Sequence, residues 1–372
     1  MADQMGDKRA GKYELIKNDA GKVKSEGRLY YQTYIPVDIA RVEIASNAGN
    51  DNLKRIYQEA GKMQGLGFYE SNYARKNRKV YQQEAASRIE CNGGRIELGD
   101  KFSNQLSNEI KSEMTLYDVL DGENSYSSQK ILQGGMKIEK HYFVYRKKQI
   151  WEDKEVKRVS LREHNPPSPE RVPELMKALM GFVERKSAMD PVIRAGLLCY
   201  QFLTVMPFEK DNEIWASILL NCFLREQGIG TGYYIPFGKD FLKQEKERKE
   251  AMKQVRESGD YGIWLQYFLE VVCKALERMN CMIMGLRQIH DHSVSSILME
   301  KQKDLLESMI IYMEETPIFT IADVEKEFQI AYNTAAKMIT IFEKHDIVKE
   351  ISKKQRYRIY CYEKYVQEIL KE

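Results

Sequence analysis

The stretch Leu203-Thr-Val-Met-Pro-Phe-Glu-Lys-Asp-Asn-Glu-Ile-Trp-Ala-Ser217 joins two apolar segments of the chain. The segment before it, Val192 to Leu203, is nearly all apolar and predicts a buried central helix. The segment Ile214 to Glu226 predicts a second buried helix. A Pro-Phe turn followed by polar residues at a helix N-terminus can bind an anion. It is equally the pattern of an ordinary helix–helix turn in which Asp211 or Asn212 caps the second helix.

Length and composition indicate a globular protein. The chain has 372 residues and 43% hydrophobic residues, which is enough for two or three domains. Charged residues make up 30% of the chain but the net charge is only +3, so a nucleic-acid-binding surface would have to be local. We find no run of about 18 apolar residues and no signal-peptide pattern in Met1 to Lys24. We therefore expect a bacterial, cytoplasmic protein that does not enter a membrane.

The cysteines and histidines do not predict a metal centre. The six cysteines form no C-x-x-C pair and are typical of free thiols in a reducing compartment. His290 and His292 are two residues apart, so on a helix they face away from each other.

The N-terminal third mixes polar segments with short regular elements. Residues 1–27 are polar and we expect them to be disordered or extended, while Tyr30 to Val37 predicts an extended arm. An apolar stripe predicts a helix that Gly65 and Gly67 end. Lys140 to Trp151 is rich in β-formers and predicts a hairpin. The apolar stripe of the helix that precedes Gly65 consists of Leu53, Ile56, Tyr57 and Ala60.

The last 70 residues have their own pattern. Thr320 to Phe328 predicts a short helix, and Asn333 to His345 predicts a second helix after a turn. Ile347 to Tyr362 alternates like two strands around the polar turn Ser352 to Gln355. This order is typical of a winged-helix domain, in which a helix–turn–helix precedes a β-wing.

The central stretch resembles the motif of the Fic family, whose domain is also called the Fido fold. Members carry H-P-F-x-x-G-N-G-R-x-x-R between two such helices. Here Pro207, Phe208 and Asn212 match, and Glu209 stands at the acidic position that lies near the magnesium ion in many members. Three further segments resemble the family's flap hairpin, the Pro-rich start of its next helix and its closing helix: Tyr145 to Trp151, Pro166 to Met176 and Glu257 to Leu269.

The resemblance implies a mainly α fold. It would consist of a Fic-type helical bundle with a small β-hairpin flap, followed by the C-terminal winged-helix domain. We expect a disordered or extended segment at 1–27, a helical region with an inhibitory-helix-like segment at 28–135, the Fic-like core at 136–290 and the winged helix at 291–372. The activity that the resemblance implies is transfer of a nucleotidyl group, usually AMP from ATP, to a hydroxyl group of a target protein.

Five positions depart from the motif. Met206 replaces the histidine that serves as general base, and a thioether cannot accept that proton near neutral pH. Asp211 and Glu213 replace two glycines, and Ile214 and Ser217 replace two arginines that neutralise phosphate. A general base alone is worth about 10²–10⁴ in rate. We therefore expect no catalytic residue, and a binding or regulatory protein in place of an adenylyltransferase.

A second segment resembles the inhibitory helix S/T-x-x-x-E-G/N of the family. Glu84 to Asn92 matches in outline and places Glu90 at the inhibitory position. Ala86 and Cys91 replace the flanking residues of the pattern, and the partner arginine is Ser217. Glu90 is therefore expected to be a structural remnant.

An alternative is an active but divergent nucleotidyl or phosphoryl transferase that uses ATP and magnesium. Glu209, Asp211 or Glu213 would then hold the metal ion. Arg146 and Lys148 of the flap would handle phosphate.

Another alternative is a regulator that binds double-stranded DNA through the winged helix. Acidic residues of the same module nearly balance its basic ones, so a protein partner or a second copy of the chain is also an expected ligand. The candidate contact residues are Asn333, Thr334, Lys337, Lys353, Lys354 and Arg356.

Overall fold

The computed structural model describes residues 9–17, 30–42, 44, 50–68, 127–134, 136–138, 141–150, 165–229, 234–352 and 358–370. It is mainly helical, as the sequence predicts. The chain divides into two compact units, and we describe each by itself. The first unit comprises residues 1–61, 115–231 and 235–276, and the second comprises 62–114, 232–234 and 277–372.

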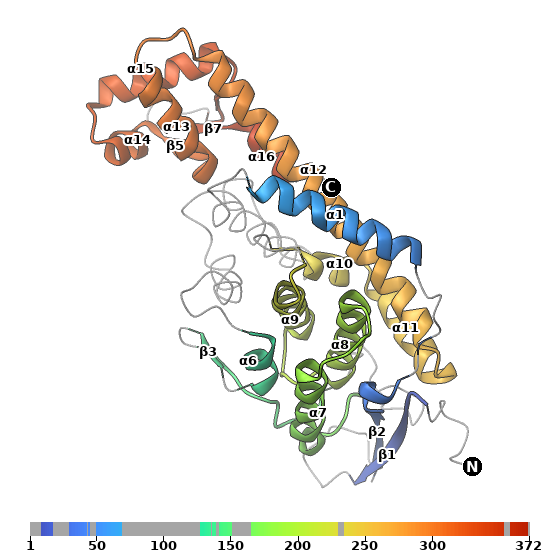
Figure 1. Ribbon diagram of the computed structural model, residues 1–372. Coiled ribbons are helices and arrows are strands. Elements are labelled where there is room, and N and C mark those ends of the chain that lie inside the picture. The colour runs from blue at the N-terminus through green and yellow to red at the C-terminus, as the bar shows by residue number, and fades with distance from the viewer. Residues whose placement is uncertain are drawn as a thin grey trace. The chain divides into compact units, whose positions relative to one another are not determined.

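The core of the first unit is built around one buried helix, α8. All of its residues from Val192 to Val205 are buried, which confirms the predicted central helix. It begins where the Asp190 side chain accepts the amide hydrogen of Val192 at 2.8 Å. Helices α7 and α9 pack against α8, and α6 packs on α7 and α9 (Figure 1). The bounds are α6 (Ser128–Gln133), α7 (Val172–Glu184), α8 (Pro191–Val205) and α9 (Asn212–Glu226).

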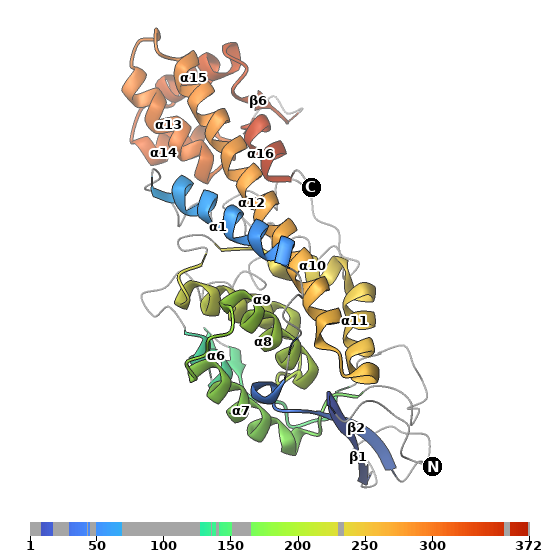
Figure 2. The ribbon, with the colours of Figure 1, turned by 45° about the vertical axis from the view of Figure 1, so that its right-hand side comes forward.

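Further helices belong wholly or in part to this unit. Helix α11 lies alongside the first turns of α12 in both views (Figure 2). Helix α1 includes Gly65 and Gly67 and has Phe68 as its last residue, so the helix end lies one residue beyond the predicted Gly-rich segment. A helical glycine costs only about 1 kcal/mol, which burial of Ile56 and Ala60 offsets. The bounds are α1 (Asn50–Phe68), α10 (Phe237–Lys243), α11 (Glu245–Ser258), α12 (Tyr261–Ser296), and the 3-10 helices η1 (Ile39–Arg41) and η2 (Pro169–Arg171).

Two small antiparallel sheets belong to the first unit. Strand β1 (Gly11–Lys17) pairs with β2 (Tyr30–Pro36), so the segments expected to be extended are partners. Strand β3 (Met136–Ile138) pairs with β4 (His141–Phe143). This hairpin begins earlier than the predicted one, and residues 144–150 form no strand. The backbone at Arg146 is instead hydrogen-bonded to Pro207. The β-propensity of a short segment does not predict such a contact with a distant residue.

The second unit contains α12 from residue 277 onward and the C-terminal elements. Its three-stranded antiparallel sheet has the order β5-β7-β6. A helix pair, α14 and α15, lies between the first two strands in the sequence, which is compatible with the expected winged helix. The bounds are α13 (Lys303–Glu315), β5 (Ile318–Thr320), α14 (Ile321–Phe328), α15 (Tyr332–Lys344), β6 (Lys349–Glu350), β7 (Ile359–Cys361) and α16 (Glu363–Leu370).

A local signal accounts for the start of α14. The Thr320 hydroxyl accepts the amide hydrogen of Asp323, whose carboxylate accepts the amide hydrogen of Thr320, so α14 begins with a capping box.

None of the helices that the structure describes combines the length and hydropathy needed to cross a bilayer.

Candidate functional site

The loop between α8 and α9 turns the chain with two left-handed residues. Met206 ends α8 with φ 45° and ψ 68°, and its amide donates to the Phe202 carbonyl at 2.9 Å. Asp211 precedes α9 with φ 66° and ψ 23°. Position 211 carries glycine in the motif pattern, and glycine adopts this conformation without a steric penalty. Aspartate is among the residues that tolerate it best, so the loop keeps the backbone shape without the glycine.

Asn212 closes this loop with its side-chain amide. Its Oδ1 accepts the amide hydrogen of Phe208 at 3.0 Å, and its Nδ2 donates to the Phe208 carbonyl at 3.0 Å. The side chain is buried, and the two bonds use the separate donor and acceptor atoms of its amide group. Asn212 therefore has a structural role in this loop, and it acts within the loop instead of capping α9.

Phe208 anchors the loop in the core of the first unit. Its ring lies 5.4 Å from Trp215, 6.1 Å from Phe202 and 6.4 Å from Tyr145, measured between ring centroids. The side chain is buried. The carbonyl of Pro207 accepts the amide hydrogen of Arg146 at 2.9 Å. The segment that follows β4 is therefore hydrogen-bonded to the same turn.

Arg146 holds the end of α8 from the other side. Its Nε donates to the Met206 carbonyl at 2.8 Å, and one terminal nitrogen donates to the carbonyls of Val205 at 3.3 Å and Pro167. The other terminal nitrogen donates to the Lys148 carbonyl at 3.3 Å. Arg146 as a whole is only 2% exposed, and burial lowers its pKa to about 10, which leaves the guanidinium charged at neutral pH.

This use of Arg146 could not be read from the sequence. The segment predicted a flap with a phosphate-binding arginine, whereas the structure directs the guanidinium at backbone carbonyls. A cation beside the last carbonyls of a helix also interacts favourably with the helix dipole. Lys148 is exposed, and no hydrogen bond from its ammonium group is recorded within the described residues.

The acidic residues of the loop have different surroundings. Glu209 is exposed. Glu213 pairs with Arg248 of α11, whose terminal nitrogen lies 3.1 Å from Glu213 Oε1. The Arg248 side chain is 5% exposed, and its Nε donates to the Phe241 carbonyl at 3.2 Å. Among the described residues, no group of three or more His, Cys, Asp or Glu side chains is placed to hold a metal ion.

The two positions that carry arginine in the motif pattern are buried. Ile214 is 1% exposed and Ser217 is 0% exposed. An arginine at either place would need space that the surrounding side chains now fill. Arg248 was not predicted as part of this site, because its charged helix gives no indication of which residue faces α9.

The remaining predicted residues lie in the second unit or outside the described residues. On α15, Asn333 and Lys337 are exposed and Thr334 is half-buried. Four further predicted residues are outside the described part of the chain: Glu90, Lys353, Lys354 and Arg356.

Comparison with protein families gives one match. The Fic/DOC family model matches residues 128–224, which include α6, α7, α8, the loop and most of α9. A comparison with curated proteins finds no match.

Three solved structures are similar to the chain. A Fic family protein from Desulfovibrio desulfuricans G20 is 12% identical, with a TM-score of 0.49, and the alignment covers 86% of this chain and 97% of that one. Fic-1 from C. elegans is 17% identical, with a TM-score of 0.44 and coverage of 62% and 72%. A Fic domain containing signaling protein from Bacteroides thetaiotaomicron VPI-5482 is 18% identical, with a TM-score of 0.41 and coverage of 62% and 98%.

Proposed function

We propose that this chain is a Fic-domain protein that no longer transfers nucleotides and acts as a binding or regulatory protein, because the Fic/DOC family model matches residues 128–224. One observation carries the proposal. The motif position of the general base holds Met206, and the two arginine positions hold the buried residues Ile214 and Ser217. The base and both phosphate-neutralising charges are therefore absent from the motif together.

The chemistry of nucleotidyl transfer explains why this matters. A hydroxyl nucleophile needs a group that takes its proton, and the transferred nucleotidyl group needs cations around its phosphate oxygens. A thioether does not accept a proton near neutral pH. A general base is worth about 10²–10⁴ in rate, and preorganised charge stabilisation is worth at least about 10²–10³.

Neighbouring charges do not substitute for the missing ones. The N–H groups of Arg146 already donate to carbonyl oxygens, and moving them would leave the end of α8 without these bonds. Arg248 is buried and paired with Glu213, so its charge is compensated. Glu209 is exposed, and among the described residues it belongs to no group of three or more acidic, histidine or cysteine side chains that could hold a metal ion.

The direct test is incubation of the purified protein with magnesium and ATP labelled at the α-phosphate, together with calorimetric titration of ATP. We expect no label on the protein and no binding tighter than about 100 μM. Label that disappears in the Glu209→Ala variant would overturn the proposal and support the metal-assisted transferase. The Glu270→Ala variant, which removes an exposed carboxylate from α12, serves as the matched control for that loss.

A restoration series separates missing chemistry from a closed site. Met206→His places an imidazole at a partly exposed position, and we expect a folded protein without activity. Ile214→Arg and Ser217→Arg bury a guanidinium, and we expect each to lower the free energy of unfolding by several kcal/mol. Self-labelling by a stable variant that combines the three changes would mean that the α8–α9 loop region still accepts ATP.

A second candidate function, DNA binding through the second unit, is favoured by the surface of α15. Asn333, Lys337 and Thr340 are exposed and lie on one face of the helix at i, i+4 and i+7. This face carries amide, ammonium and hydroxyl groups, all of which can contact phosphates and base edges. Glu343, the single acidic residue of α15, lies near its C-terminal end.

Fluorescence anisotropy with a labelled duplex tests this candidate. Lys337→Ala should weaken binding across sequences, and the affinity should fall as the salt concentration rises. Lys274→Ala removes an exposed charge from the first unit and should leave binding unchanged. A protein partner or a second copy of the chain would be indicated if no duplex binds and co-purification or sedimentation shows an assembly.

A further inference from the structure

We propose that the first unit contains a binding site for a small inorganic anion at the guanidinium of Arg256, in the last turn of α11. Arg256 is 5% exposed, and its Nη1 atom is buried without a hydrogen-bond partner. Burying a charge is costly unless an opposite charge or hydrogen bonds compensate it. A buried polar atom without a partner therefore indicates a bound ion or water molecule. The site involves neither the α8–α9 loop nor α15, so it is independent of both proposed functions.

Carboxylates close to Arg256 in the sequence face solvent or are engaged elsewhere. The Glu257 side chain is 63% exposed, and its carboxylate lies 4.0 Å from the Lys253 ammonium group. Asp260 accepts the amide hydrogen of Gly262 at 2.8 Å, in the first turn of α12. In the described part of the chain, the Arg256 side chain forms no ion pair and no hydrogen bond. Its charge is therefore not compensated by these residues.

Other buried arginines of the first unit have partners. Arg146 and Arg194 donate to backbone carbonyl groups. Arg248 pairs with Glu213 at 3.1 Å. Arg256 is similarly buried but has neither kind of partner among the described residues, and this difference distinguishes it from an ordinary structural arginine.

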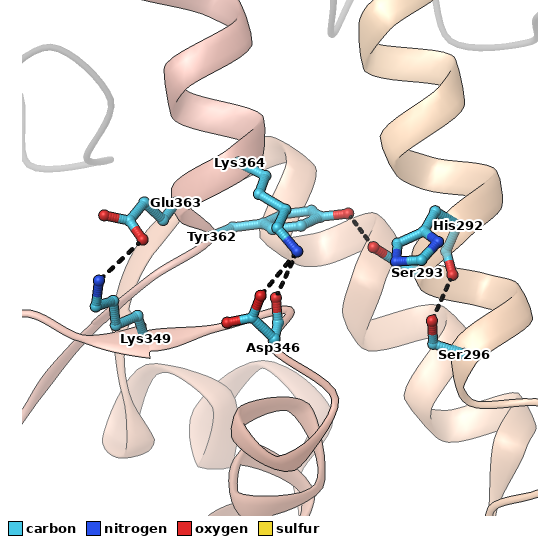
Figure 3. A network of polar contacts seen from close by, with 8 residues as sticks. All are labelled: His292, Ser293, Ser296, Asp346, Lys349, Tyr362, Glu363 and Lys364. Atoms are coloured by element: carbon cyan, nitrogen blue, oxygen red, sulfur yellow. Dashed lines mark hydrogen bonds and ion pairs between the residues drawn. The ribbon is translucent and has the colours of Figure 1, made fainter.

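Two exposed lysines of the second unit show the usual pairing of a cation with a carboxylate. Lys349 lies 3.2 Å from Glu363, and Lys364 lies 2.9 Å from Asp346 (Figure 3). The two lysine side chains are 65% and 49% exposed, so water solvates them as well. A nearly buried guanidinium receives little such solvation, which makes a bound anion the effective counter-charge for Arg256.

The C-terminal end of α11 does not account for this arginine either. A cation near the last carbonyl groups of a helix interacts favourably with them. Here the Val255 carbonyl accepts the amide hydrogen of Gly259 at 2.8 Å. The Ser258 carbonyl accepts a hydrogen bond from a terminal nitrogen of Arg9 at 2.7 Å. Since these carbonyl groups have donors of their own, the guanidinium of Arg256 is available for another acceptor.

Tyrosine hydroxyl groups near Arg256 supply no negative charge. Burial raises the pKa of Tyr34 on β2 and of Tyr200 on α8 far above the usual value, while the positive charge of Arg256 acts in the opposite direction. Both phenols therefore stay neutral at pH 7. The rings of Tyr200 and Tyr261 lie 5.1 Å apart, measured between their centroids. An anion at Arg256 would thus connect α11 to aromatic residues of β2, α8 and α12.

Burial restricts the ligand to a small ion. Because only 5% of Arg256 is exposed, a bulky ligand would have to displace the side chains around it. A guanidinium donates charge-assisted hydrogen bonds to oxyanions, and its charge also attracts halides. Chloride, nitrate and inorganic phosphate are therefore suitable probes.

The test measures thermal unfolding of the full-length protein at neutral pH and constant ionic strength, while sodium gluconate, whose anion is bulky, is replaced by each of the three sodium salts. We expect at least one of the small anions to raise the Tm of the wild type by on the order of 2–4 °C more than that of Arg256→Gln. Lys253→Gln removes an exposed charge from the same helix and is the matched control. It should respond like the wild type, which separates the site from general effects of salt.

A calorimetric titration with the same three salts measures binding directly. We expect one saturable site in the wild type and none in Arg256→Gln, with circular dichroism establishing that each variant is folded. If Arg256→Gln does not fold, Arg256→Lys replaces it, and this variant should respond less than the wild type because an ammonium group lacks the planar donor pair of a guanidinium. The proposal is overturned if none of the three anions binds saturably, if the arginine variant responds like the wild type, or if Lys253→Gln loses the response equally.

Discussion

The side chain of Arg146 fixes the α8–α9 loop through carbonyl oxygens of three separate segments. Its planar guanidinium presents five N–H donors at fixed angles, and it donates four hydrogen bonds to backbone carbonyls. A single substitution at this residue should therefore affect the whole turn.

Arg146→Lys should lower the free energy of unfolding by about 2–4 kcal/mol, because a lysine ammonium cannot reach the same carbonyls and leaves several buried acceptors without a donor. Urea denaturation of the two proteins measures the difference. Lys148→Ala, at an exposed position two residues away, should change stability by less than about 0.5 kcal/mol. An Arg146→Lys protein as stable as that control would show that the carbonyl contacts contribute little.

The backbone at Asp211 gives a second prediction at the same scale. Because φ is 66° there, Asp211→Gly should be more stable than Asp211→Ala by about 1 kcal/mol, although both changes remove the same carboxylate. Glu209 has no positive φ, so Glu209→Gly should instead be less stable than Glu209→Ala. Thermal unfolding of the four variants decides the matter, and equal stabilities at position 211 would contradict the assigned backbone conformation.

At the scale of elements, α9 and α11 are joined by a charged pair that the motif comparison did not suggest. In the sequence, Glu213 replaces a glycine of the motif and is a candidate metal ligand of the divergent transferase. In the structure its carboxylate pairs with Arg248, which is nearly buried and also holds the Phe241 carbonyl. The glutamate that replaces the motif glycine is thus paired with an arginine of α11.

A double-mutant cycle with Glu213→Gln and Arg248→Met should give a coupling energy of about 1–2 kcal/mol, because one partner is shielded from solvent. The pair Glu245–Lys249 on α11 is largely exposed and should couple by about 0.3–0.5 kcal/mol. Chemical denaturation of the single and double variants measures both. Similar coupling in the two pairs would mean that burial adds nothing to the Glu213–Arg248 contact.

At the scale of the whole molecule, the second unit has a hydrophobic core of its own. All buried members of this cluster lie between Leu286 and Ile369, and they come from α12, α13, α14, α15, α16 and the sheet. A core drawn from one continuous stretch can form without the first unit.

We therefore expect residues 277–372 to fold alone, with helical circular dichroism and one cooperative urea transition. Within this fragment Met309→Ala should lower stability by about 2–4 kcal/mol, since Met309 is 0% exposed. Met299→Ala, at a residue 98% exposed, should change it by less than about 0.5 kcal/mol. A gradual transition in the unmodified fragment would show that this core needs the rest of the chain.

The sequence by itself determined the features that depend on residue identity and short-range periodicity. The apolar runs of α8 and α9, the helices α14 and α15, and the replacement of the base by Met206 are all visible without coordinates, because burial of a helix face and the chemistry of a side chain are local properties. The winged helix, the catalytic inactivity and the DNA contacts stay predictions.

Only the tertiary structure decided which distant groups meet. Strand β1 pairs with β2, and β5 pairs with β7, although nothing in either segment names its partner. Arg146 meets the end of α8, and Arg248 meets Glu213, across many intervening residues. Such contacts depend on how whole elements pack, and many arrangements of these charges satisfy the same local pattern. For this reason the sequence located the loop, and the fold determined what holds it.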